Sequence, residues 1–294
     1  MRVSDLTISN NYINNLNTTK KRLDKLQKEV STQTKISVPS DSPSGTVKIL
    51  RYNGRLTQAD TYSKNIETSL SFLEQTTAQL NTIQTQTSDL LAKFTELKNA
   101  TVDSSLNIYA EKVDDAIKTM LDAANSEFDG KYIFGGTDYS QAPYGYNAGG
   151  TAIELKVPDV SGEQNVKISA NITQKTNMTG DEIFGNLDVF NTLITIRDNL
   201  KLGIRPSDAE IKVVQDFNDH ILAKSSQAGN IMNQLDSAST LLQQQTLSLQ
   251  KLISNEQDVD IAKATVDLQD ADYHLQLSYK ISAMILPKSL LDYL

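Results

Sequence analysis

The sequence predicts a mainly α-helical protein, built as a bundle of long helices with a small β insertion and paired helical arms at its two ends. Three observations lead to this prediction. Apolar residues recur at heptad spacing through long stretches that lack proline. Ten of the 13 glycines lie between Gly130 and Gly203, where the helical periodicity stops. Hydrophobic residues make up only 38% of the 294 residues, which suits helices packed side by side better than a compact sphere.

The N-terminal segment, residues 1–42, is expected to form a helical arm. Its few apolar residues include Leu16, Leu23 and Val30, which follow one another at seven-residue intervals. This spacing is a weak coiled-coil pattern. Because so little surface can be buried, the segment by itself is expected to be disordered or a marginal helix.

A break is predicted where this arm ends. Pro39 and Pro43 lie close together around Asp41, and we assign these three residues to a hinge. Ser42 before Pro43 favours a helix start, because serine caps the first turn and proline is tolerated at the first helical position. A long helix is therefore expected from Pro43 onward.

The helical bundle is expected to combine residues 43–140 with residues 187–254. Five heptads of the first part predict two rows of core positions. These rows are Ile66, Leu73, Leu80, Thr87 and Phe94, and Ser69, Thr76, Ile83, Leu90 and Leu97. A second helix should run from Leu106 to Phe128 and end in a left-handed turn at Gly130.

The second part of the bundle begins with a predicted helix over residues 186–202. A capping-box pattern at Ser207 and Glu210 marks the start of another long helix. Its heptad positions are Ala228, Leu235, Leu242 and Leu249 in one row, and Ile231, Ala238 and Leu252 in the other. No proline follows before Pro287, so this helix is predicted to continue into the C-terminal arm.

Between the two parts, residues 141–186 are expected to form a small β domain. Strands are predicted at residues 131–134, 152–157 and 165–171, with turns that contain glycine and proline between them. The domain is too small to hold a large pocket.

The C-terminal arm, residues 255–294, carries two apolar stripes on nearly opposite sides of a helix. A surface helix needs only one stripe, so two stripes require two partner surfaces. One stripe is Val259, Val266, Tyr273, Leu277, Ile281 and Met284, and the other is Ile261, Ala264, Leu268, Leu275, Tyr279 and Leu286. We expect the N-terminal arm, through Leu16, Leu23 and Val30, to cover one stripe and a neighbouring subunit to cover the other.

Charge and composition exclude several classes of function. Residues 1–60 carry ten Lys or Arg against five acidic residues, whereas residues 255–294 carry three against seven, so the two ends are suited to lie together. The net charge of −8 argues against broad binding of nucleic acid through phosphates. No apolar run is long enough for a membrane span, and the N-terminus lacks the apolar core of a cleavable signal peptide.

No catalytic, cofactor or metal site is expected. The chain has no cysteine, and its two histidines, His220 and His274, lie in polar helical surroundings. Common metalloprotease, redox, hydrolase and phosphate-loop motifs are absent. Asp258-Val259-Asp260 is similar to the start of a calcium loop but lacks its glycine and distal glutamate. The sequence thus predicts a protein without enzymatic activity or cofactors.

Several segments together carry a more specific signal. They are FDGKYIFGGT at residues 128–137, the hinge at Pro39–Pro43, DVDIAKA at residues 258–264 and the ending SLLDYL. Over most of residues 1–140 and 205–294 the chain resembles the bacterial flagellin family, and within it the hook-associated proteins of the hook–filament junction. It departs from the family at residues 31–38, STQTKISV, where Ser-Gly-Lys-Arg-Ile-Asn is frequent.

The resemblance implies a structural component of the bacterial flagellum that joins hook to filament as a ring of subunits. Such a protein would be exported by the flagellar type III apparatus, after a cytoplasmic chaperone has held its C-terminal region. Its neighbours would be further copies of itself, the hook-side junction protein and flagellin. Its arms would pair as helices on assembly, its β domain would face outward, and its final location would be extracellular.

Two alternatives stay open. The chain could be a flagellin filament subunit, although its small insertion and its LLDYL ending count against this. It could also be a cytoplasmic coiled-coil scaffold, because the heptads alone would permit one.

Overall fold

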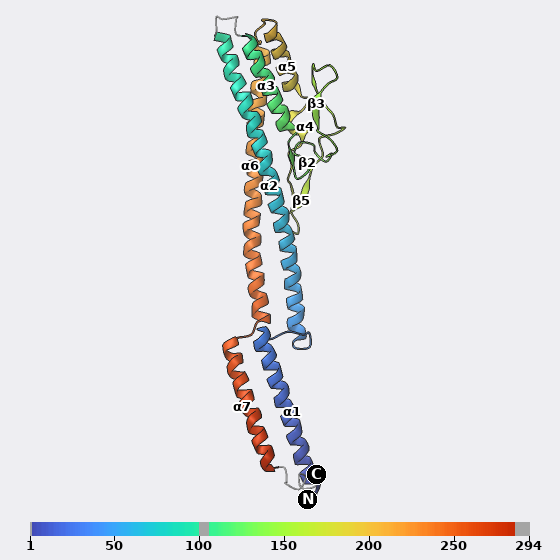
Figure 1. Cartoon of the computed structure of the whole chain (residues 1–294), viewed down its shortest axis with the longest axis vertical. Helices are drawn as coiled ribbons and strands as arrows, with labels where there is room; N and C mark the ends of the chain where they lie inside the picture. Colours follow the sequence, from blue (N-terminus) through green and yellow to red (C-terminus); the bar gives the residue numbers. More distant parts are fainter. Residues whose placement is uncertain (1, 100–105, 286–294) are drawn as a thin grey trace. The chain divides into compact units, whose positions relative to one another are not determined.

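The computed structural model describes residues 2–99 and 106–285, and it is mainly helical as predicted (Figure 1). Its helices are α1 (Arg2–Thr32), α2 (Pro43–Asn99), α3 (Leu106–Ala124), α4 (Gly180–Phe184), α5 (Asp188–Lys201), α6 (Asp208–Gln257) and α7 (Ile261–Ile285). Its strands are β1 (Glu127–Phe128), β2 (Lys131–Tyr132), β3 (Tyr144–Tyr146), β4 (Ile153–Leu155), β5 (Asn165–Lys167) and β6 (Thr173–Lys175).

The chain divides into two compact units. We call Met1–Gln58 with Gln245–Leu294 the arm unit, and Ala59–Gln244 the bundle unit. The long helices α2 and α6 contribute residues to both units. The finer boundaries that the sequence indicates, at residues 42, 140, 186 and 254, stay predictions.

Both predicted helix starts are confirmed. At α2, the Gly45 amide donates to Ser42 Oγ at 3.2 Å. At α6, the Glu210 amide donates to Ser207 Oγ at 3.3 Å, and the Ser207 amide donates to Glu210 Oε2 at 2.7 Å. These side chains satisfy amides that have no partner within a helix, and they fix where each helix begins.

The core of the bundle unit follows the predicted heptads. All ten predicted core positions of α2 are buried, and they pack with residues of α6 such as Ile221 and Leu235. The polar members have hydrogen-bond partners. Thr76 Oγ1 donates to the Phe72 carbonyl at 2.8 Å, and Thr87 Oγ1 donates to Asn218 Oδ1 of α6 at 2.9 Å. Threonine is therefore compatible with the core, because no hydroxyl is buried unpaired at these positions.

An aromatic cluster attaches the insertion to the helices. The ring of Phe184 on α4 lies 5.5 Å from that of Phe134, 5.0 Å from that of Tyr144 and 5.6 Å from that of Phe190 on α5. The first two pairs are edge-to-face, an arrangement that adds to the stabilisation from burial. α5 in turn packs along α3, so the cluster is continuous with the helical core.

The insertion consists of three two-stranded antiparallel sheets, β1–β2, β3–β4 and β5–β6. The predicted strands at residues 152–157 and 165–171 contain β4 and β5. β3 and β6 were not predicted, because three residues are too few to show strand alternation. The β5–β6 hairpin is fixed to the long helices, since Ile168 is buried among residues of α2 and α6 and Asn65 Nδ2 donates to the Lys167 carbonyl at 2.9 Å.

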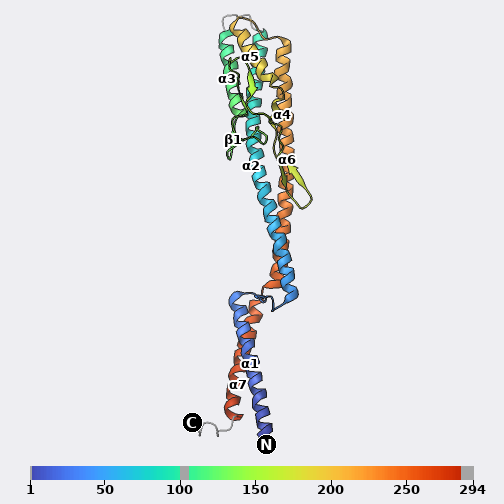
Figure 2. The same ribbon diagram turned by 90° about the vertical axis from the view of Figure 1, so that its right-hand side faces the viewer.

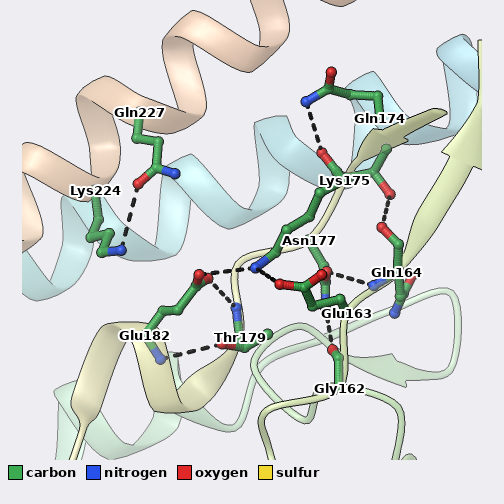
Figure 3. A network of polar contacts seen from close by, with 11 residues as sticks. Gly162, Glu163, Gln164, Gln174, Lys175, Asn177, Thr179, Glu182, Lys224 and Gln227 are labelled. Carbon is green, nitrogen blue, oxygen red and sulfur yellow. Dashed lines mark hydrogen bonds and ion pairs between the residues drawn. The ribbon is translucent and has the colours of Figure 1, made fainter. Parts of the chain in front are cut away.

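A polar network closes the base of this hairpin (Figure 3). Lys175 Nζ lies 3.0 Å from Glu163 Oε1 and 2.9 Å from Glu182 Oε1. The amide of Gln164 donates to Asn177 Oδ1 at 2.8 Å. Glu182 also completes a capping box with Thr179 at the start of α4. The network therefore ties the two strands to a helix end through Lys175, which is half-buried between an exposed Glu163 and a half-buried Glu182.

The prediction for Gly130 was wrong. α3 ends at Ala124, and Asp129 (φ 52°) with Gly130 (φ 71°) forms the turn of the β1–β2 hairpin. An Asp-Gly pair with two positive φ angles matches the twist of a two-residue hairpin turn, which here prevails over a helix ending. Phe128 accordingly lies in β1, with its ring 6.2 Å from that of Phe72 on α2.

The predicted continuity of the last helix was also wrong. α6 ends at Gln257 and α7 begins at Ile261. Asp260 Oδ1 accepts the Lys263 amide at 3.1 Å and so caps the new helix. Leu252, one of the predicted heptad positions near this break, is exposed. Pro287, where the helix was expected to stop, lies outside the described residues.

Candidate functional site

Helices α1 and α7 form a pair in which several large apolar side chains of α7 remain exposed. They run antiparallel along each other (Figure 2). Tyr12 of α1 donates its hydroxyl to the Ser278 carbonyl of α7 near one end of the pair. Near the other end, the residues that follow α1 bond those that precede α7. The pairing therefore extends along most of both helices.

On α1, one row of side chains turns away from solvent. Leu16, Leu23 and Val30 are all half-buried, as are Thr19 and Leu26 between them. The heptad spacing in the sequence thus corresponds to the face that lies along α7. None of these residues is fully buried within the single chain.

On α7, the face toward α1 is built from small and large residues in alternation. Ala264 and Ala271 are each 3% exposed, and Leu268 and Leu275 are half-buried. Ala271 was missed in the sequence, although the spacing 264, 268, 271, 275 is a heptad pattern that could have revealed it. Two alanines allow the backbones to approach closely, so this stripe is covered by α1.

Two further residues of the same predicted stripe are placed differently. Ile261 is exposed at the first turn of α7. Tyr279 is also exposed, but its ring lies beneath the ammonium group of Lys20 of α1, 5.7 Å from nitrogen to ring centroid. Such cation–π contacts stabilise exposed sites by about 0.5–1 kcal/mol.

Three residues of the second predicted stripe of α7 are exposed. Val266 is 57% exposed, Tyr273 is 62% exposed and Ile281 is 42% exposed. At about 100° per residue, Val266 and Tyr273 lie on the side of the helix opposite Ala264 and Ala271, and Ile281 lies on the flank between the two sides. Leu277 and Val259 are half-buried beside them. We call Val266, Tyr273, Leu277 and Ile281 the free face of α7.

Comparison with known proteins identifies the family of this chain. The family model for the bacterial flagellin N-terminal helical region matches residues 3–138, and that for the bacterial flagellin C-terminal helical region matches residues 211–294. The chain belongs to the bacterial flagellin family. The resemblance inferred from the hinge, from residues 128–137 and from the C-terminal segments is thereby confirmed. A search of curated protein sequences gave no match.

Solved structures share the fold of this flagellin-family chain. A proposed flagellar hook-associated protein of Vibrio parahaemolyticus is 18% identical, with a TM-score of 0.66 over 74% of this chain and 100% of its own. FlgL of Bacillus cereus is 20% identical, with a TM-score of 0.60 over 69% and 99%. Flagellar hook-associated protein-3 of Legionella pneumophila is 14% identical, with a TM-score of 0.62 over 69% and 98%.

The predicted hinge is a compact loop in this flagellin-family chain. The carboxylate of Asp41 accepts the amides of Ser37 and Val38, each at 3.0 Å. These two backbone hydrogen bonds lower the pKa of Asp41 below its ordinary value. Pro39 is exposed within the loop, and Pro43 begins α2.

The loop also packs closely on the first turn of α2. Gly45 is buried, and a Cβ added there would lie 2.6 Å from Cδ1 of Ile36. The segment therefore has a defined conformation, which its two prolines favour because each fixes its own φ angle.

Residues 2–99 and 106–285 contain no group of three or more His, Cys, Asp or Glu that could hold a metal ion. Within the same ranges, no helix has the length and apolar character that crossing a membrane requires. His274 is exposed, and a ring nitrogen of His220 lies 2.7 Å from the Glu182 carbonyl.

Proposed function

We propose that this flagellin-family chain joins the hook to the filament of the bacterial flagellum as a ring of subunits. The observation that carries the proposal is the free face of α7, where Val266, Tyr273 and Ile281 are exposed while Ala264 and Ala271 of the same helix are packed on α1. The fold shared with two proteins named as hook-associated, those of Vibrio parahaemolyticus and Legionella pneumophila, supports the junction in preference to the filament. A filament subunit is the alternative, because the family models describe flagellins in general.

In this proposal, assembly completes the stabilisation of the arms. Full burial of an aliphatic or aromatic side chain contributes about 1.5–3 kcal/mol. Ordering a residue costs about 1–2 kcal/mol for its backbone, so a pair of helices with half-buried contacts is only marginally stable by itself. Neighbouring copies would cover the free face, and the arms would become firmly ordered only in the ring.

This mechanism predicts how amide exchange changes. In the purified monomer, amides of Asp258–Ile281 should exchange faster than those of α2, and they should become protected on assembly. Protection of Asp258–Ile281 equal to that of α2 in the monomer would contradict assembly-coupled ordering.

The expected partners follow from the same proposal. They are further copies of the chain, the hook-side junction protein, flagellin, the flagellar type III export apparatus and a cytoplasmic chaperone at the C-terminal region. The protein would be extracellular after a transient stay in the cytoplasm, and the β hairpins would face outward. It would act without cofactor or catalysis, since its task is to present matching surfaces to two different neighbours.

A gene deletion tests the proposal and separates it from the alternative. Loss of a junction protein should leave hooks in place and release flagellin into the medium. Loss of a filament subunit should leave no flagellin to release. Electron microscopy of the hooks and immunoblotting of the medium give the two readouts.

Complementation then tests the free face. The double variant V266D/Y273D should restore neither filaments nor flagellin retention, because it places charges on the surface that neighbours cover. The variant I172D, at an exposed position near the tip of the β5–β6 hairpin, should restore both. Equal complementation by the two variants would refute the role of the free face.

A further inference from the structure

The two breaks in the helices of the arm unit meet each other. The Lys35 amide donates to the Gln257 carbonyl at 2.8 Å, and the Val259 amide donates to the Gln33 carbonyl at 3.1 Å. Thr34 and Asp258 face each other between these bonds as an antiparallel bridge. The segment after α1 and the segment before α7 are thus joined by backbone hydrogen bonds, independently of any side-chain packing.

The conformation of Gln33 makes this crossing possible. Its φ of 59° lies in the left-handed region, which is uncommon for a residue other than glycine. It follows directly after the last residue of α1, so the chain turns sharply there. The turn directs the Gln33 carbonyl to the Val259 amide. Backbone outliers of this kind persist where surrounding contacts hold them in place.

Two lysines hold the end of α6 at the same point. Lys35 Nζ donates to the Asn255 carbonyl at 2.6 Å, and Lys48 Nζ donates to Glu256 Oε1 at 2.8 Å. The last carbonyls of a helix lack internal partners and attract cations. Asp260 caps the start of α7 shortly afterward. The crossing therefore also has side-chain contacts, one from Lys35 within the α1–α2 break and one from Lys48 in α2.

The α1–α7 interface itself specifies its register poorly. On α7, Ala264 and Ala271 are identical residues seven positions apart, and so are Leu268 and Leu275. On α1, Leu16 and Leu23 repeat at the same interval. Sliding one helix by a heptad would bring like residues against like at these positions, although Thr19 and Leu26 of α1 would exchange places. Such repeats need an additional feature to select one alignment.

We propose that Gln33–Lys35 and Gln257–Val259 form a clasp that sets the register of α1 against α7. The clasp fixes the helices at one end, and the bond from Tyr12 to Ser278 near the other end agrees with the same alignment. With the register set, Ala264 and Ala271 stay toward α1 and the free face stays outward. The consequence for assembly rests on the proposed function, whereas the clasp itself can be tested on the purified chain.

A designed disulfide tests whether the clasp forms. The chain has no cysteine, so introduced cysteines are the only thiols. Thr34 and Asp258 form a pair without mutual hydrogen bonds, whose Cα atoms lie about 4.5 Å apart in antiparallel strands, within the range of a disulfide. In a glutathione redox buffer, T34C/D258C should form its disulfide at least tenfold faster than the control S37C/D258C. Equal rates would overturn the clasp.

A spin-label measurement tests the register. Nitroxides at N17C on α1 and Q269C on α7, both exposed positions, should give one narrow distance in the wild-type background. V259P removes the amide that bonds Gln33, and it should add a second population displaced by about one heptad along the helix, or roughly 10 Å. V259A keeps the amide and should retain the single distance. A single unchanged distance in V259P would refute the register role.

Discussion

The guanidinium of Arg197 on α5 lies 3.0 Å from the carboxylate of Asp114 on α3, and the Arg197 side chain is 12% exposed. The pair with Asp114 connects two helices that pack along each other, and Arg197 also bonds its neighbour Asp198 on α5 at 2.8 Å. The variant R197M keeps an apolar stem and removes the charge. We expect it to lower the free energy of unfolding by about 1–3 kcal/mol in a urea titration, because Asp114 loses a partner in a shielded place.

The matched control is K212M. Lys212 Nζ lies 3.1 Å from Asp216, but both side chains are well exposed. Exposed pairs contribute about 0–1 kcal/mol, so K212M should change stability by less than R197M. If the two variants were equally destabilised, the Arg197 pair would have no special role between α3 and α5.

The same carboxylate predicts a dependence of stability on pH. The hydrogen bond from Lys118 lowers the pKa of Asp114 below its ordinary value, burial opposes this, and the bond from Arg197 adds to the lowering. A carboxyl group with a lowered folded pKa stabilises the fold above its unfolded pKa of about 4, and this contribution is lost as pH falls through the folded pKa.

The measurement compares wild type with D114N at two pH values. At pH 7 the free energy of unfolding of D114N should be lower than that of wild type. As the pH falls through the lowered pKa of Asp114 the two values should converge, because the wild-type carboxyl then becomes protonated too. A difference that does not change with pH would show that the effect of D114N is unrelated to ionisation.

Two glycines predict opposite effects of the same substitution. A Cβ at Gly180, the first residue of α4, would fall against the Tyr144 hydroxyl and the Phe134 carbonyl. The Tyr144 hydroxyl is buried without a hydrogen-bond partner among the described residues, and burial raises its pKa. G180A should therefore destabilise the bundle unit by about 1–3 kcal/mol, the usual range for overpacking.

G229A should instead stabilise the protein by about 0.5–1 kcal/mol. Gly229 lies in the interior of α6, and no neighbouring atom lies within 4 Å of an added Cβ. Alanine loses less conformational freedom in a helix than glycine does. Thermal unfolding of both variants measures the two signs. A stabilised G180A would show that the contact between Gly180 and Tyr144 is not tight in solution.

The sequence was most informative where one local pattern repeats. Ten core positions of α2 could be predicted because an amphipathic helix of five heptads places the same face inward at every turn. The starts of α2 and α6 were predictable for a similar reason, since Ser42 and Ser207 act on amides within the next turn.

The features that were missed depend on residues far apart in the chain. The break between α6 and α7 has no proline or glycine, and it is stabilised by backbone bonds from Gln33 and Lys35, more than two hundred residues upstream. The turn at Gly130 was misassigned because glycine suits both a helix ending and a hairpin, and the packing of Phe128 on Phe72 selects the hairpin. The stripe of α7 that packs within the chain likewise could not be identified from α7 alone, because it is the stripe that contacts α1.

Substitution by aspartate should have different results on the two faces of α7. Ala271 lies on the side that packs on α1 and is only 3% exposed, whereas Val266 lies on the free face and is 57% exposed. In the purified monomer, A271D should reduce the helix content seen by circular dichroism and speed amide exchange in α1 and α7, because a carboxylate would be buried without a partner. V266D should leave both measurements unchanged and still prevent complementation of the deletion strain. If V266D disturbed the monomer as much as A271D, the free face would belong to the intramolecular pairing and would not be a surface for neighbouring subunits.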